Sequence, residues 1–258
     1  FIAMWSGSLA GYWYHLLTRR TRTLVPSRII GARVYVTAIL LYVAVMGARN
    51  LPVANGRVGA FAARFAEYVV DDLRGRNWLL TAGLLDDNVA LAAWQRGVRL
   101  HLLNVRQAGG DAYGRYVASL FENPRYKSLA RVGLGPLMSE WLKQDPAVST
   151  QLAAVSLPDV WLEAGLVPRP TRILYIGEQP TQAVDVAELT AAFDAFWKDY
   201  GAQANARPRQ HPLVSSYDRQ IVMHLAKMAN NLGVYLEDRE RSDLAIAYYR
   251  QAREMDPQ

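Results

Sequence analysis

Two adjacent carboxylates, Asp86 and Asp87, are the residues of this chain best placed to do chemistry. They lie in the segment GLLDDN (83–88), directly after a short apolar run that is predicted to be a strand. Ligands of parallel sheets bind beyond the carboxyl ends of the strands, where paired carboxylates can hold a metal ion or a sugar hydroxyl. Asp is also the residue that commonly caps a following helix. We therefore interpret Asp86 and Asp87, with Tyr116 further along, as a tentative ligand site or a helix cap.

Other catalytic classes lack their residues. The absence of cysteine excludes a disulfide framework, a thiolate zinc site and a cysteine nucleophile. The sequence has no HExxH, Walker, GxSxG or GxGxxG motif. We therefore leave the catalytic residues unassigned, and we expect no metal ligand and no cofactor. The histidines (His15, His101, His211 and His224) are too far apart for metal spacing, and five tryptophans (Trp78, Trp94, Trp141, Trp161 and Trp197), although able to stack on sugars, are spaced as core residues.

The elements that position the acidic pair form a predicted βαβ unit. Residues 78–81 and 99–105 are apolar runs typical of strands, and the helical pattern between them ends at Gly97. A strand, a helix and a strand within about thirty residues indicate two parallel strands. The chain as a whole is therefore expected to be mainly α with a small α/β portion. The other expected elements are an amphipathic helix (56–74), broken helices (111–165), a strand (173–176) preceded by Pro168 and Pro170, and a helix (187–200).

The net charge of +6 has a local origin. Five arginines crowd beside an apolar run, and without them the charge falls to about +1, so no nucleic-acid partner is expected. The run itself, residues 34–48, carries no charge and reaches the roughly 20 residues of a membrane span when extended to 29–53. The alternative is a buried helix of a soluble protein. The arginines are Arg19, Arg20, Arg22, Arg28 and Arg33.

A second apolar run, residues 1–17, precedes the arginines, and short arginine-rich loops stay on the cytoplasmic side. We therefore expect a transmembrane hairpin over residues 1–53 with a cytoplasmic loop at 18–28. An extracytoplasmic α/β domain (54–200), a linker (201–212) and a helical repeat (213–258) would follow. Because the chain opens inside an apolar stretch without a basic leader, we expect it to be a piece of a longer polytopic protein.

The last section has the spacing of two helices, residues 217–237 and a second one ending at Met255. It resembles a tetratricopeptide repeat, but Ala229 and Leu236 depart from the usual tryptophan and tyrosine. One repeat is visible and about three are needed for stability, so a helical hairpin packed on the preceding domain is the alternative. The matching positions are Leu232, Gly233, Ala245, Tyr249, Ala252 and Pro257.

The segment 77–116 resembles the region after the last membrane helix in a family of bacterial polytopic membrane proteins. That family is similar to membrane protein O-mannosyltransferases of the multi-spanning glycosyltransferase fold, and many members end in tetratricopeptide repeats. The chain departs from the family at 89–93, which is aliphatic where the family is polar and aromatic. The matching residues are Gly83, Asp86, Asp87, Gln95, Gly97, Arg99, Asn104 and Tyr116.

The resemblance implies a bacterial inner-membrane protein whose C-terminal domain lies outside the cytoplasm. A lipid-linked sugar would be the donor, and catalysis would depend on residues outside this chain. We expect the chain to be a non-catalytic portion that positions an acceptor or partner. The alternative is a membrane-tethered scaffold whose repeat recruits an envelope or secretion protein.

Overall fold

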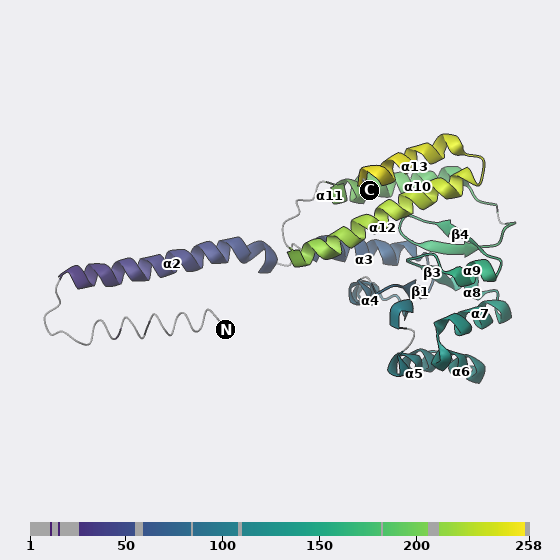
Figure 1. Cartoon of the computed structure of the whole chain (residues 1–258), viewed down its shortest axis with the longest axis horizontal. Coiled ribbons are helices and arrows are strands. Elements are labelled where there is room, and N and C mark those ends of the chain that lie inside the picture. Colours follow the sequence, from purple (N-terminus) through teal and green to yellow (C-terminus); the bar gives the residue numbers. More distant parts are fainter. Residues whose placement is uncertain are drawn as a thin grey trace. The chain divides into compact units, whose positions relative to one another are not determined.

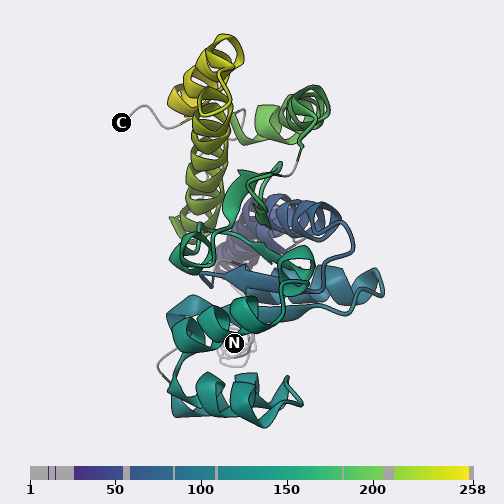
Figure 2. The ribbon, with the colours of Figure 1, turned by 90° about the vertical axis from the view of Figure 1, so that its right-hand side faces the viewer.

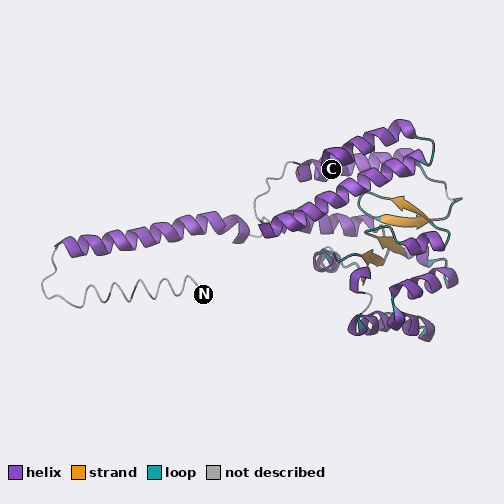
Figure 3. Ribbon diagram, in the orientation of Figure 1, coloured by secondary structure: helices purple, strands orange, loops and turns teal. Residues whose placement is uncertain are grey.

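The computed structural model describes residues 11, 15, 26–54, 59–83, 85–107, 110–181, 183–205 and 212–255. By its contacts the chain forms two compact units, residues 1–58 and residues 59–258. The protein is mainly helical with a small mixed sheet, as the sequence predicts (Figure 3).

The described part of the first unit contains the long helix α2 (Pro26–Ala54). Its uncharged stretch 34–48 is apolar, and large side chains such as Leu40, Leu41 and Tyr42 are 63–65% exposed. No helix in the described ranges combines the length and the apolar character that a bilayer crossing requires. Of the expected hairpin, residues 29–53 are helical, while the arm 1–17 and the loop 18–28 lie mostly outside the described residues.

The second unit is built around a five-stranded sheet in the order β2-β1-β3-β5-β4. Strand β1 pairs in parallel with β2 and β3, and β5 pairs antiparallel with β3 and β4. The sheet is therefore mixed, with the expected parallel βαβ unit at one edge. The strands are β1 (Trp78–Thr81), β2 (His101–Asn104), β3 (Leu152–Ala154), β4 (Val167–Pro170) and β5 (Tyr175–Glu178).

Helices cover both faces of this sheet (Figures 1 and 2). On one side lie α10 (Val186–Phe196), α12 (Pro212–Glu237) and α13 (Ser242–Met255), and on the other lie α5 (Asp111–Ser119), α6 (Pro124–Val132) and α7 (Leu134–Gln144). The remaining helical elements are α3 (Ala60–Asp72), α4 (Asp86–Gln95), η2 (Val105–Gln107), α8 (Val148–Gln151), α9 (Asp159–Glu163), η3 (Trp197–Gly201) and α11 (Ala202–Asn205).

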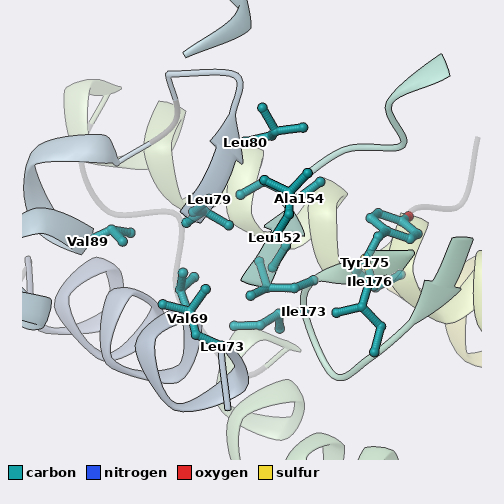
Figure 4. Close-up of a cluster of buried hydrophobic side chains, with 14 of the residues drawn as sticks. Val69, Leu73, Leu79, Leu80, Val89, Leu152, Ala154, Ile173, Tyr175 and Ile176 are labelled. Carbon is teal, nitrogen blue, oxygen red and sulfur yellow. The ribbon is translucent and has the colours of Figure 1, made fainter. Parts of the chain in front are cut away.

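The core follows the alternation of β1. Leu79 points towards Val69 of α3 and Val89 of α4, whereas Leu80 points to the opposite face (Figure 4). Trp78, on that opposite face, packs edge-on against Trp141 of α7 at a centroid distance of 4.9 Å. All these side chains are buried, which explains why the run reads as continuously apolar.

One buried carboxylate, Asp72 at the end of α3, fixes the turn before β5. It accepts hydrogen bonds from the hydroxyl of Thr171 (2.5 Å), Nε of Arg172 (3.0 Å) and the backbone N–H of Ile173 (3.1 Å). These donors satisfy a charge that would otherwise be costly to bury. The first helix of the unit is thereby joined to a turn about a hundred residues later.

The C-terminal helix pair α12–α13 packs on this sheet. Nε2 of His224 hydrogen-bonds the carbonyl of Ile173 (2.8 Å), and Nδ2 of Asn231 donates to the hydroxyl of Tyr175 (2.6 Å). The hydroxyl of Tyr235 donates to the buried Glu178 (3.1 Å). The segment 213–258 therefore belongs to the second unit and not to a separate body.

Several boundaries differ from those expected. Residues 152–154 form a central strand where the pattern predicted helix, and the strand expected at 173–176 begins at Tyr175. Pro168 and Pro170 lie within β4, which tolerates them because it is an edge strand. Of the expected linker 201–212, residues 201–205 are helical and 206–211 lie outside the described residues.

Candidate functional site

The candidate site lies at the carboxyl ends of β1 and β2. The parallel register pairs Thr81 with Asn104, so the last residue of each strand is polar and the two are neighbours. Helix α4, which connects the strands, begins at Asp86. This is the position at which parallel sheets bind their ligands.

The turn between β1 and α4 has an unusual backbone. Gly83 has φ +84°, and a Cβ atom there would come within 3.0 Å of Nδ2 of Asn104. Leu85 also has a positive φ of 61°, which is strained for a residue with a branched side chain. This turn lets the chain reverse sharply enough to bring Asp86 back over the end of β1.

Asp86 is the centre of a hydrogen-bond network. Its Oδ2 accepts from the hydroxyl of Thr81 and from Nδ2 of Asn104, both at 2.9 Å. Its Oδ1 is buried and has no hydrogen-bond partner within the described part of the chain. Burial raises the pKa of Asp86 above its ordinary value of 3.8, although the two donors act to lower it and Asp87 adds repulsion.

The orientation of Asn104 is fixed by its other contacts. Its Oδ1 accepts from the backbone N–H of Arg106 (2.9 Å), so its Nδ2 must face Asp86. The backbone N–H of Asn104 donates to the hydroxyl of Tyr113 (2.5 Å), and burial raises the pKa of that phenol. The ring of Tyr113 lies 5.9 Å from the half-exposed ring of Tyr116. A chain of contacts therefore runs from Asp86 through Asn104 and Tyr113 to Tyr116.

The structure separates the two acidic residues predicted from the sequence. Asp86 is partly buried in the network, whereas Asp87 is exposed on the first turn of α4. The N-cap residue of α4 is Leu85, whose side chain makes no cap hydrogen bond, and Asp86 is bound by Thr81 and Asn104. The helix-cap interpretation thus does not describe Asp86, because its carboxylate turns back to the strand ends.

Sequence reasoning did not identify Thr81 and Asn104 as partners of Asp86. The available signal was a side chain able to donate a hydrogen bond at the last residue of the first predicted strand and one residue before the end of the second. His101, at the other end of β2, packs against Trp78 with tilted rings at a centroid distance of 4.4 Å and takes no part in the network.

Four of the five tryptophans are buried, as expected for core residues. The exception is Trp94 on α4, which is 76% exposed. The buried ones are Trp78, Trp141, Trp161 and Trp197.

The repeat-like positions gather where α12 and α13 approach each other. A Cβ atom on Gly233 would lie 2.6 Å from Cε1 of Tyr249, so the two helices approach closely at these residues. Leu232, Ala245 and Ala252 are buried in the same helix pair. Pro257 lies outside the described residues.

The Asp86 network contains a carboxylate, an amide and two phenol groups, which are groups that commonly hydrogen-bond and stack on hydroxyl-rich ligands. No cluster of three or more histidine, aspartate or glutamate residues able to hold a metal occurs in the ranges described.

The chain matches no protein-family model, no curated protein and no solved structure.

Proposed function

We propose that the second unit positions a hydroxyl-rich substrate group at the Asp86 network, as the non-catalytic C-terminal portion of a membrane glycosyltransferase-like protein. The observation that carries this proposal is the buried Oδ1 of Asp86, which has no partner among the described residues, at the carboxyl ends of two parallel strands. A ligand hydroxyl donating to this oxygen would offset the cost of burying it unpaired. The resemblance of residues 77–116 to O-mannosyltransferase-like proteins supports a sugar as that ligand.

The expected ligand is the sugar of a polyprenyl-phosphate donor or of a glycan acceptor. Asp86 and Asn104 would bind its hydroxyls, and Tyr116 would supply an aromatic face. Because the Asp86 carboxylate is already held by two donors, it serves to orient a ligand. The transfer reaction itself would use residues outside this chain.

Attachment to the bacterial inner membrane is part of the same proposal. The supporting feature is the uncharged stretch 34–48 of α2, whose apolar side chains are exposed on the helix, unlike those of a core helix. At about 1.5 Å per residue the stretch is shorter than the roughly 30 Å hydrocarbon core, so the flanking Arg33 and Arg49 would have to reach to the two interfaces. Resistance of the chain to alkaline carbonate extraction tests this attachment, and full release would contradict it.

Charge supports the proposed topology. Residues 1–58 contain seven arginines and no acidic residue, and five of these arginines precede the uncharged stretch 34–48, whereas Arg49 and Arg57 follow it. The remaining residues, 59–258, carry a net charge of −1 within a total of +6. Arginine-rich short segments beside membrane helices stay on the cytoplasmic side, and a nearly neutral domain can be exported. Cysteine-accessibility labelling of an engineered Asp87→Cys chain in intact spheroplasts would report the side on which the second unit lies.

Ligand binding is tested with polyprenyl-phosphate mannose in detergent micelles. We expect the wild-type chain to bind this donor more tightly than the same lipid without the sugar. Asp86→Asn should weaken donor binding by about tenfold, a loss of roughly 1.4 kcal/mol, because the charged acceptor is removed. Asp87→Asn, on the exposed neighbour, is the matched control and should bind as the wild type does.

Equal binding of the wild-type chain to the lipid with and without the sugar would refute the sugar site. Equal affinities of the Asp86→Asn and Asp87→Asn variants would remove Asp86 from it. Thermal unfolding of each variant verifies that the fold is retained.

A second candidate is the membrane-tethered scaffold, in which the tetratricopeptide-like helix pair recruits an envelope or secretion partner. The observation that favours it is the close packing of Gly233 against Tyr249, which is the small-residue contact typical of such pairs. The exposed Ile246 of α13 is then available to a partner. A photo-crosslinking amino acid at position 246 should capture one specific protein in cells. The absence of any crosslinked product above background would count against the scaffold.

A further inference from the structure

A small cavity of about 190 Å³ lies away from the Asp86 network, beside the β4–β5 hairpin. Its walls come from the turn after α3, from β4 and β5, and from the start of α10. Arg74 and Arg169 contribute positive charge, Glu178, Asp185 and Glu188 contribute negative charge, and the apolar lining includes Val184 and Leu189.

Part of this charge is already committed within the protein. Arg169 forms an ion pair with Glu178, which is almost fully buried and also accepts from Tyr235. That pair is electrically neutral and held in place by α12. The charges available to a ligand are therefore those of the other three residues.

Arg74 supplies the available positive charge. It has a positive φ of 50°, which places it in the left-handed turn that ends α3, and it makes no ion pair with another described residue. Burial, together with Arg169 and Arg74, lowers the pKa of the neighbouring Arg76.

Asp185 and Glu188 supply the available negative charge. Oδ1 of Asp185 accepts from the backbone N–H of Glu188 (3.0 Å) and so caps α10. Neither carboxylate forms an ion pair within the ranges described. The cavity thus has a cationic group from the α3 turn and anionic groups from the α10 terminus.

We propose that this cavity binds a free α-amino acid as its zwitterion. The guanidinium of Arg74 would hold the carboxylate, the carboxylates of Asp185 and Glu188 would hold the ammonium group, and Val184 and Leu189 would contact the side chain. A simple anion would leave the two carboxylates without a partner, and a simple cation would leave Arg74 without one, whereas a zwitterion pairs with both.

The size of the cavity supports a ligand of this class. At about 30 Å³ per water molecule, 190 Å³ offers the room of roughly six waters. Typical sites for larger ligands occupy about 300–1,000 Å³. The volume therefore suits a ligand of the size of a small amino acid.

The test is isothermal titration of the full chain in detergent micelles with glycine, L-alanine, L-serine and L-valine. Acetate and methylamine serve as probes that each carry one of the two charges. We expect at least one amino acid to bind with a Kd of about 1 mM or below, and both single-charge probes to bind about tenfold more weakly or worse.

Two variants on different elements identify the site. Arg74→Gly keeps a residue that tolerates the positive φ and removes the guanidinium, and Glu188→Gln removes one negative charge from α10. Each should weaken amino-acid binding by about tenfold, whereas Arg131→Met, on the exposed face of α6, should leave it unchanged. Mannose-lipid binding by the same variants reports independently on the Asp86 network.

Several results would overturn the proposal: no binding of any of the four amino acids at about 10 mM, single-charge probes that bind as well as the zwitterions, or unchanged affinity in both variants. An unaltered thermal transition in Glu188→Gln excludes misfolding as the cause of a loss, because this side chain is solvated at the start of its helix.

Discussion

Replacing Gly233 by alanine tests the packing of the C-terminal helix pair. In an open helix this change stabilises a protein by up to about 1 kcal/mol, because alanine restricts the unfolded chain and favours the helix. Here the new Cβ would lie 2.6, 2.8 and 3.0 Å from three ring atoms of Tyr249. Ordinary carbon contacts are about 3.5–4.0 Å, so the ring would have to move by roughly 1 Å.

The ring of Tyr249 is not free to move without loss. Its hydroxyl donates to Glu237 at 2.7 Å, and the ring is half-buried between α12 and α13. Overpacking of this kind costs about 1–3 kcal/mol, and losing the hydrogen bond costs about 1 kcal/mol more. After the helix-propensity gain is subtracted, we expect Gly233→Ala to lower the free energy of unfolding by about 1–3 kcal/mol.

Urea denaturation followed by far-ultraviolet circular dichroism measures this change. In a Tyr249→Ala background the clash is absent, so the same glycine substitution should become stabilising by about 1 kcal/mol. Gly47→Ala, within α2 and followed by alanine, has no atom within 4 Å of the new Cβ, so it is the control and should not destabilise. The reasoning fails if Gly233→Ala is as stable as the wild type, or if its effect is the same in both backgrounds.

Three further changes probe buried charge. Because the pKa of Asp86 is raised, the folded state favours the protonated acid, and the contribution of Asp86 to stability is greatest below a pH of about 4 and declines as pH rises through the folded pKa. In urea titrations at several pH values, Asp86→Asn should flatten this dependence of stability on pH, and Asp87→Asn should not. Burial lowers the pKa of His224 below 6.5, so its contribution to stability should be full above that pH and should fall as pH drops through the folded pKa. In the His224→Gln variant this fall in the free energy of unfolding at low pH should be absent. Asp72→Asn should cost about 3–5 kcal/mol at pH 7, since it leaves Arg172 without its buried partner, and an unchanged urea midpoint would contradict this.

The local pattern was sufficient to predict the βαβ unit. The apolar run of β1, the glycine that ends α4 and the second run at β2 are all encoded within about thirty residues. Gly233 and Tyr249 were singled out as repeat-like positions, but their mutual contact depends on how α12 packs on α13, which the helical period alone does not give.

Strand β3 was not predictable in the same way. Its residues, Leu-Ala-Ala, suit a helix, and they form a strand because they pair with β1 more than seventy residues earlier. The donors to Asp86 were missed for a related reason. Only the register between β1 and β2 brings Thr81 and Asn104 together, and no local period carries that register.

Helix α3 is covered by residues that are synthesised much later, and this has a consequence for how the protein is made. Phe61 of α3 stacks on Tyr200, whose hydroxyl also donates to the carbonyl of Phe61, and Phe65 contacts His224. The first of these pairs is 139 residues apart in sequence. At about 5–20 residues per second, a ribosome needs roughly 7–28 s to deliver Tyr200 after Phe61 has been made. For that interval the nascent chain carries an amphipathic helix with a bare aromatic face, and this helix is where we expect a chaperone to bind the growing polypeptide.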